Sequence, residues 1–332
     1  MGSIWKIGSN AILELGKIYC EIMLRLFISV MILLATVACG SRATSTVGVV
    51  AASSEEALFS PSMPPDSLTP EQRIAYMRDH FWDNLDFSDT VWIVSTDTTH
   101  MLRAFHEYVR TFVTPADPSP LVVLMQKASQ SKVALTYFAM LAERVLHDPS
   151  SPVYSDELYI PVLNALIESP LLDEWEKTVP RHDLQLAMQN RVGTPANDFR
   201  YTLATGRTGT LYGIRAEYTL VFFNNPDCAM CKTLIRQMTD SPVLSELIGQ
   251  GRLKILALYP DEDLTAWRAH IPDIPSTWIN GYDAGTQISR NNLYDLRAIP
   301  SLYLLDRNKR VLLKDVYDVG YVEWVLSNNS VK

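Results

Sequence analysis

The chain has 332 residues, of which 47% are hydrophobic, so it is long enough and apolar enough to bury two hydrophobic cores. It carries 29 Lys and Arg against 37 Asp and Glu, a formal net charge of −8, with no run of basic residues. Because nucleic-acid binding depends on basic residues that neutralise phosphates, we expect no nucleic-acid partner. The chain has no internal repeat of fixed period, which argues against a solenoid or a propeller.

The N-terminal segment has the features of a targeting signal. Residues 26–38 (LFISVMILLATVA) form an apolar stretch that is short for a membrane span but suits the hydrophobic region of a signal peptide. Two acidic residues, Glu14 and Glu21, lie where a signal peptide is normally positive, whereas Met23 is followed two residues later by an arginine. We therefore predict that translation starts at Met23 and that residues 1–22 are an annotation extension.

The end of this apolar stretch, Thr36-Val37-Ala38-Cys39-Gly40-Ser41, resembles the lipoprotein box of bacteria. A small residue precedes the cysteine, although Thr36 departs from the leucine that is usual three positions earlier. The resemblance implies that residues 1–39 are a signal segment, that Cys39 is lipid-modified, and that the protein is anchored on the periplasmic side of the envelope, at the outer membrane. Two alternatives stay open, namely a secretory peptide in which Cys39 is incidental and an uncleaved anchor.

Residues 66–191 are predicted to form a mostly α-helical domain, preceded at residues 40–65 by a flexible tether rich in Ser, Ala, Thr and Pro. A helix start is expected at Thr69, with Pro70 at the first helical position and Gln72 completing a capping box. Further helical periods follow, broken by proline-containing turns. No two histidines of this domain have metal-binding spacing and no catalytic constellation occurs in it, so we expect neither a metal nor a cofactor there.

From residue 192 to residue 332 the pattern changes to strands that alternate with helices. A hairpin and four buried strands are expected at residues 201–214, 217–224, 253–259, 301–305 and 311–316. Helices are expected around residues 232–238, 243–248, 263–270, 291–296 and 321–326. This alternation predicts an α/β sheet with helices on both faces.

The segment FFNNPDCAMCK at residues 222–232 places a C-x-x-C pair at the end of one predicted strand. If the signal predictions above hold, Cys228 and Cys231 are the thiols that remain in the mature protein. A disulfide across so short a loop adds little stability, so a structural disulfide explains the pair poorly. The pattern also fits metal sites, and Met230 could add a soft ligand for Cu(I) between the two thiols.

Residues 193–332 resemble the thioredoxin-like proteins of the periplasmic TlpA/ResA type. The shared features are GTPANDF at residues 193–199 followed by a strand, the C-x-x-C, an α/β insert, and RAIPSLYLLD at residues 297–306. The resemblance implies a thioredoxin fold with a redox-active disulfide, in which Cys228 attacks and Cys231 resolves the mixed disulfide. It also implies that Pro300 is a cis-proline that faces the dithiol and aligns the substrate. The whole chain is similar to bacterial lipoproteins whose helical N-terminal domain has no known function.

Residues around the motif predict a mild dithiol. Asp227 replaces the aromatic residue that often precedes such a motif, and its carboxylate opposes the stabilisation of a thiolate by the helix terminus. Ala229 and Met230 supply neither a histidine nor a lysine. The sequence therefore predicts an extracytoplasmic thiol-disulfide oxidoreductase, a mild reductant or isomerase, with protein disulfides as substrates and an upstream electron donor. The alternative is a non-catalytic thioredoxin-fold binding lipoprotein.

Overall fold

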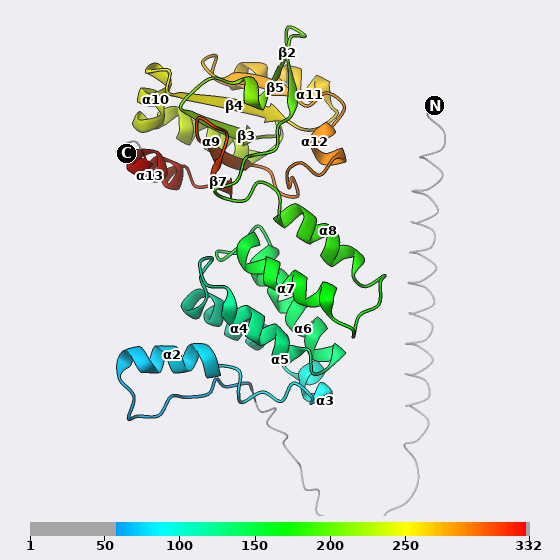
Figure 1. Cartoon of the computed structure of the whole chain (residues 1–332). Helices are drawn as coiled ribbons and strands as arrows, with labels where there is room; N and C mark the ends of the chain where they lie inside the picture. Colours follow the sequence, from blue (N-terminus) through cyan, green and yellow to red (C-terminus); the bar gives the residue numbers. More distant parts are fainter. Residues whose placement is uncertain (1–57, 330–332) are drawn as a thin grey trace, which may run out of the picture. The chain divides into compact units, whose positions relative to one another are not determined.

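The computed structural model describes residues 58–329, and these belong to one compact unit. The helices of its first part (Figure 1) are α2 (Pro70–His80), α3 (Thr90–Ser95), α4 (Thr98–Phe112), α5 (Ser119–Ala128), α6 (Lys132–Ala142), the π-helical turn η1 (Glu143–His147), α7 (Asp156–Glu168) and α8 (Thr178–Ala187). Among the helices within residues 58–329, none combines the length and the apolar character that a bilayer crossing requires. Met23, Cys39 and the signal segment lie outside the described residues, so these predictions stay predictions.

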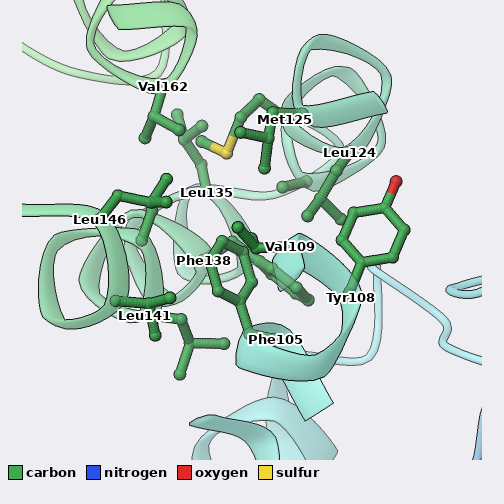
Figure 2. Close-up of a cluster of buried hydrophobic side chains, with 14 of the residues drawn as sticks. Phe105, Tyr108, Val109, Leu124, Met125, Leu135, Phe138, Leu141, Leu146 and Val162 are labelled. Carbon is green, nitrogen blue, oxygen red and sulfur yellow. The ribbon is translucent and has the colours of Figure 1, made fainter. Parts of the chain in front are cut away.

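The helices α4, α5, α6 and α7 pack around one hydrophobic core built on aromatic rings. Phe105 and Phe138 are fully buried, and the ring of Phe138 meets that of Trp82 edge to face with 5.2 Å between the centroids. Figure 2 shows Phe138 in the middle of the cluster, among leucine side chains from α6 and the turn after it. Tyr108 instead turns its hydroxyl away from the cluster, where it donates to the backbone oxygen of Pro120. A buried aromatic ring contributes about 2–3 kcal/mol, so this cluster is the main stabilising feature of the helical part.

Helix α2 begins where the sequence predicts it, at Pro70 after an N-cap at Thr69. The Thr69 hydroxyl accepts a hydrogen bond from the backbone N–H of Gln72 (3.3 Å), and the Gln72 side chain accepts one from the backbone N–H of Thr69 (3.0 Å). This reciprocal pair satisfies two N–H groups that a helix start otherwise leaves unbonded.

Thr69→Ala removes half of this capping box, and we expect it to cost about 1 kcal/mol of local stability. Native-state hydrogen exchange of the α2 amides measures the effect, which should appear as a roughly fivefold loss of protection. The control is Thr136→Ala in the middle of α6, where the threonine hydroxyl bonds the Lys132 carbonyl and caps nothing. Unchanged protection of α2 in Thr69→Ala would contradict the capping role.

The second part of the unit is a seven-stranded mixed sheet of order β2-β1-β5-β4-β3-β6-β7. Its strands are β1 (Arg200–Leu203), β2 (Thr208–Thr210), β3 (Tyr218–Phe223), β4 (Leu253–Tyr259), β5 (Ile279–Tyr282), β6 (Ser301–Leu305) and β7 (Val311–Val316). Its helices are α9 (Ala229–Asp240), α10 (Pro242–Gly249), α11 (Leu264–Ala269), α12 (Gln287–Arg290) and α13 (Val319–Asn329), with 3-10 turns η2 (Leu211–Gly213) and η3 (Ile271–Asp273). β3 runs parallel to β4 and antiparallel to β6, and all of its residues are buried.

Both faces of this sheet are covered. Leu220 and Phe222 of β3 pack in one cluster with side chains of α9, α10 and α13, whereas Val221 and Phe223 pack on the other face with Ile288 of α12. The alternation follows from the period of two along a strand. A helical part followed by an α/β sheet is the fold class that the sequence predicts.

Two local predictions were wrong. The helix expected at residues 291–296 does not form, because α12 ends at Arg290 and Asn292 takes a left-handed conformation (φ 48°). Tyr294 is instead placed in the core, with its hydroxyl donating to the backbone of Asn197. Strand β5 was missed, because its four residues, INGY, are too few to show an alternating pattern and include a glycine.

Polar contacts join the helical part to the sheet. The Lys314 ammonium on β7 lies 2.7 Å from the Asp156 carboxylate on α7 and also donates to two backbone oxygens near the end of α8. The Tyr154 hydroxyl donates to the Asp315 carboxylate (3.1 Å). The domain boundary between residues 191 and 192 stays a prediction, since residues 58–329 belong to one compact unit.

Candidate redox site

Cys228 lies at the junction between the buried strand β3 and helix α9. Asn225 holds the turn before Cys228 through two hydrogen bonds. Its side-chain oxygen accepts one from the backbone N–H of Asp227, and its backbone oxygen accepts the other from the backbone N–H of Cys228. Cys228 is the N-cap of α9, and its sulfur accepts a hydrogen bond from the backbone N–H of Cys231 (3.1 Å). The N-terminus of a helix favours negative charge, so the sulfur stands where a thiolate is stabilised.

Cys231 sits in the first turn of α9 and is only 1% exposed, whereas Cys228 is partly exposed. Burial, together with its contact with Cys228, raises the pKa of the Cys231 thiol to about 12. Neither cysteine forms a disulfide in this structure. The pair therefore combines an accessible sulfur with a protonated one behind it, which is the division of labour expected of an attacking and a resolving thiol.

Alkylation with iodoacetamide at pH 8 should modify Cys228 and spare Cys231. A thiol with the raised pKa of Cys231 is almost wholly protonated at this pH and is shielded from the reagent, so we expect its rate to be lower by at least ~100-fold. Peptide mapping of the full chain by mass spectrometry reads both sites. Labelling in urea, where burial is lost, is the control and should modify both; equal rates in the native protein would contradict the structure.

Pro300 comes next to this pair from the far end of the sequence. The Ile299–Pro300 peptide bond is cis, and the Ile299 carbonyl oxygen lies 3.6 Å from the Cys228 sulfur. Strand β6 begins directly after the proline and pairs with β3, with Ser301 opposite Phe223. The sheet thus brings together the three residues that the sequence singled out, Cys228, Cys231 and Pro300.

The loop before Pro300 is braced by an arginine that sequence reasoning did not select. The Arg297 guanidinium bonds the buried Asp295 carboxylate through Nε (2.9 Å) and through Nη2, and it also donates to the imidazole of His147 on η1. Burial works against ionisation of Asp295, but the hydrogen bonds from Arg297 prevail and hold its pKa below the usual range. Burial and the nearby guanidinium lower the pKa of His147. No pattern in the sequence links Arg297 to His147, because they lie 150 residues apart in the chain.

A small cavity of about 20 Å³ lies behind the motif, where Cys231 is buried. Its lining includes Trp267, His270 and Asn280. This volume is enough for one water molecule. Within residues 58–329, no three His, Cys, Asp or Glu side chains gather in a way that could hold a metal ion.

Residues 38–190 match the family described as "Domain of unknown function (DUF5106)", and no curated protein matches the chain. A thioredoxin-like protein from Bacteroides caccae is 39% identical over 82% of this chain and 98% of its own, with a TM-score of 0.75. The chain belongs to this thioredoxin-like family. The fold class and the thioredoxin-like resemblance stated from the sequence are therefore confirmed, whereas the lipoprotein assignment of this thioredoxin-like protein stays a prediction.

Two further solved structures are each similar to part of this thioredoxin-like protein. The C-terminal domain of an uncharacterized protein from Bacteroides fragilis is 51% identical over 42% of this chain and 98% of its own, with a TM-score of 0.41. The thioredoxin domain of a thiol-disulfide oxidoreductase from Bacteroides vulgatus is 15% identical over 42% of this chain and 97% of its own, with a TM-score of 0.36.

Proposed function

We propose that this thioredoxin-like protein is a thiol-disulfide oxidoreductase with protein disulfides as substrates. One observation carries the proposal: the sulfur of Cys228 caps helix α9 and lies 3.6 Å from the Ile299 carbonyl, beside the cis-proline. The Cys228 sulfur is partly exposed and lies next to the backbone at Pro300, which leaves room for an extended substrate strand beside it. The pair would therefore act through Cys228, Cys231 and Pro300.

The chemistry needs two electrons and no cofactor. The Cys228 thiolate attacks one sulfur of the substrate disulfide, forms a mixed disulfide and releases the other substrate sulfur as a thiolate that takes up a proton. Cys231 then loses its proton, attacks the Cys228 sulfur and releases the second substrate thiol. The product is the Cys228–Cys231 disulfide, which an upstream dithiol donor must reduce before the next turnover.

The surroundings of the motif favour a mild dithiol, a reductant or an isomerase. Asp227 is exposed and places a negative charge directly before Cys228. Ala229 and Met230, the two residues between the cysteines, are exposed and bring no positive charge to the sulfur. A thiolate that is only moderately stabilised makes a poorer leaving group, so the disulfide form is a weaker oxidant.

The protein would work outside the cytoplasm. The apolar stretch at residues 26–38 and the lipoprotein-like context of Cys39 support export and lipid attachment at that cysteine, on the periplasmic side of the outer membrane. In this arrangement residues 40–65 would tether a helical domain at residues 66–191 and a redox domain at residues 192–332. This compartment is oxidising, so disulfides form and persist there and redox-active cysteines are common.

The test is reduction of insulin disulfides with dithiothreitol as the electron donor. The protein should shorten the lag before the insulin B chain precipitates, in proportion to its concentration. A lag that equals the buffer control would favour the alternative, a thioredoxin-fold lipoprotein that binds partners without catalysis.

A further inference from the structure

A cavity of about 660 Å³ lies between the helical part and the β7 side of the sheet. One wall comes from the helical part, with Pro152 and Tyr154, and the other from the end of β7 and the start of α13, with Val316, Tyr317 and Tyr321. This volume lies within the range of ligand sites, and a lining of tyrosine and other apolar side chains is typical of such sites.

The cavity lies one strand away from the segment that follows the cis-proline. Val316 in its wall pairs with Leu302 on β6, and Leu302 is two residues beyond Pro300. Neither Cys228 nor Pro300 lines the cavity. At about 3.3 Å per residue along a strand and about 5 Å between strands, a ligand that reaches both places must extend over roughly 10 Å. A small disulfide is too short for this, whereas an extended polypeptide is long enough.

The charges in the wall favour a basic ligand. Asp156 is paired with Lys314, and Glu157 is paired with Arg191. The carboxylate of Asp315 accepts a hydrogen bond only from neutral groups such as the Tyr154 hydroxyl, and within residues 58–329 it forms no ion pair. Burial raises its pKa to about 6, which still leaves it charged at neutral pH. The cavity therefore offers a negative charge that no cation of the described residues neutralises.

We propose that this cavity receives an extended segment of the protein substrate, with a lysine or arginine near its disulfide, while Cys228 attacks the disulfide itself. The inference rests on the proposed function and gives the helical part a role in substrate selection.

Two synthetic peptides test it, each with one cysteine in a mixed disulfide with glutathione and differing only in a lysine or a glutamate two residues from that cysteine. The full chain should reduce the lysine peptide with a kcat/KM about tenfold higher than the glutamate peptide, and Asp315→Asn should remove most of this preference. Hydroxyethyl disulfide serves as the small substrate for comparison.

Val192→Trp tests the cavity by volume, because Val192 lines it and is 60% exposed, so the larger side chain can be accommodated without disturbing a core. The ratio of kcat/KM for the lysine peptide to that for hydroxyethyl disulfide should fall about tenfold. The matched control is Val94→Trp on α3, also exposed and outside the cavity, which should leave the ratio unchanged within about twofold.

This inference alone would be overturned if the protein reduced all three substrates without preferring the lysine peptide, and if the ratio of kcat/KM for the lysine peptide to that for hydroxyethyl disulfide were the same in both tryptophan variants. Absence of activity on every substrate would overturn the proposed function and this inference with it. The peptide pair needs no variant, so the charge preference is tested in the wild-type protein even where a variant folds poorly.

A second inference comes from the small cavity behind Cys231. His270 lines it on the side of α11, and its Nδ1 bonds the backbone oxygen of Ala266 (2.9 Å), which must be the acceptor. Nδ1 therefore carries a proton, and in the neutral imidazole Nε2 keeps a lone pair. Lys232 and Asp273 are the other charged groups in the lining. We propose that His270 takes the proton of Cys231, through one water in this cavity, as the thiolate of Cys231 attacks the mixed disulfide.

Ellman's reagent separates the two steps, because Cys228 releases one thionitrobenzoate on attack and Cys231 releases a second on resolution. In the full chain with Cys20→Ser and Cys39→Ser, His270→Gln should slow the second release about tenfold at pH 7, and added imidazole should restore it. The first release should change little. His182→Gln, at an exposed histidine of α8, is the control. A second release at the wild-type rate, or a slow one that imidazole does not restore, would overturn this assignment.

Discussion

Replacement of Cys228 by serine is expected to abolish disulfide reduction. A serine hydroxyl is not ionised at neutral pH and attacks disulfides poorly, so the accessible nucleophile at the start of α9 is lost. The buried Cys231 cannot take over, since it is 1% exposed and its pKa is raised to about 12. We expect kcat/KM for insulin or for a peptide disulfide to fall by at least ~10³-fold, to the uncatalysed level.

Met230→Leu is the matched control for this loss. Met230 lies between the cysteines and is 53% exposed, and leucine keeps its bulk while removing the sulfur. Disulfide reduction should survive this change. If Met230→Leu instead abolished activity as fully as Cys228→Ser does, the motif would have to be reconsidered as a Cu(I) site, in which soft sulfur ligands take part together.

Arg297→Met is expected to have the largest effect on stability. The substitution leaves the carboxylate of Asp295, whose side chain is 4% exposed, without its counter-ion. Breaking a buried pair from one side typically costs about 3 kcal/mol or more, because an uncompensated charge stays in the interior. For a chain of this size the melting temperature should fall by roughly 6–12 °C. Thermal unfolding followed by circular dichroism measures the shift.

The control for Arg297 is Arg181→Met on α8. Arg181 pairs with Glu174, whose side chain is 78% exposed, and an exposed pair contributes less than about 1 kcal/mol. A second arm adds Asp295→Leu to Arg297→Met, which removes the orphaned charge and should recover part of the lost stability. Equal melting temperatures for Arg297→Met and Arg181→Met would show that the guanidinium does not brace the loop before Pro300.

The elements that could be predicted from the sequence are those set by neighbouring residues. The start of α2 depends on Thr69 and Gln72, three residues apart, and the strand-to-helix junction at Cys228 depends on an apolar run followed by a turn. Pro300 was found through a family resemblance, because nothing in its neighbourhood alone points to a dithiol 69 to 72 residues earlier in the chain. Local chemistry therefore located the motif, and the resemblance supplied its partner.

Long-range pairing explains what could not be predicted. Arg297 meets His147 because the turn η1 and the loop before β6 are packed together, and no periodicity connects them. The segment at residues 291–296 has helical spacing, but burial of Tyr294 in the core and the left-handed conformation of Asn292 override it. His270 was not selected from the sequence, because it is a lone histidine. Only the structure shows that His270, at the end of α11, lines the same cavity as Cys231 on α9.

The most direct test of the account is to trap the reaction halfway. Cys231→Ser removes the resolving thiol, so the mixed disulfide formed by Cys228 should accumulate when the full chain, with Cys20→Ser and Cys39→Ser, is mixed with oxidised insulin. We predict a covalent adduct that dithiothreitol cleaves by reduction and that mass spectrometry maps to Cys228. No adduct, or the same amount of adduct in a variant that also carries Cys228→Ser, would contradict thiol-disulfide exchange at this site.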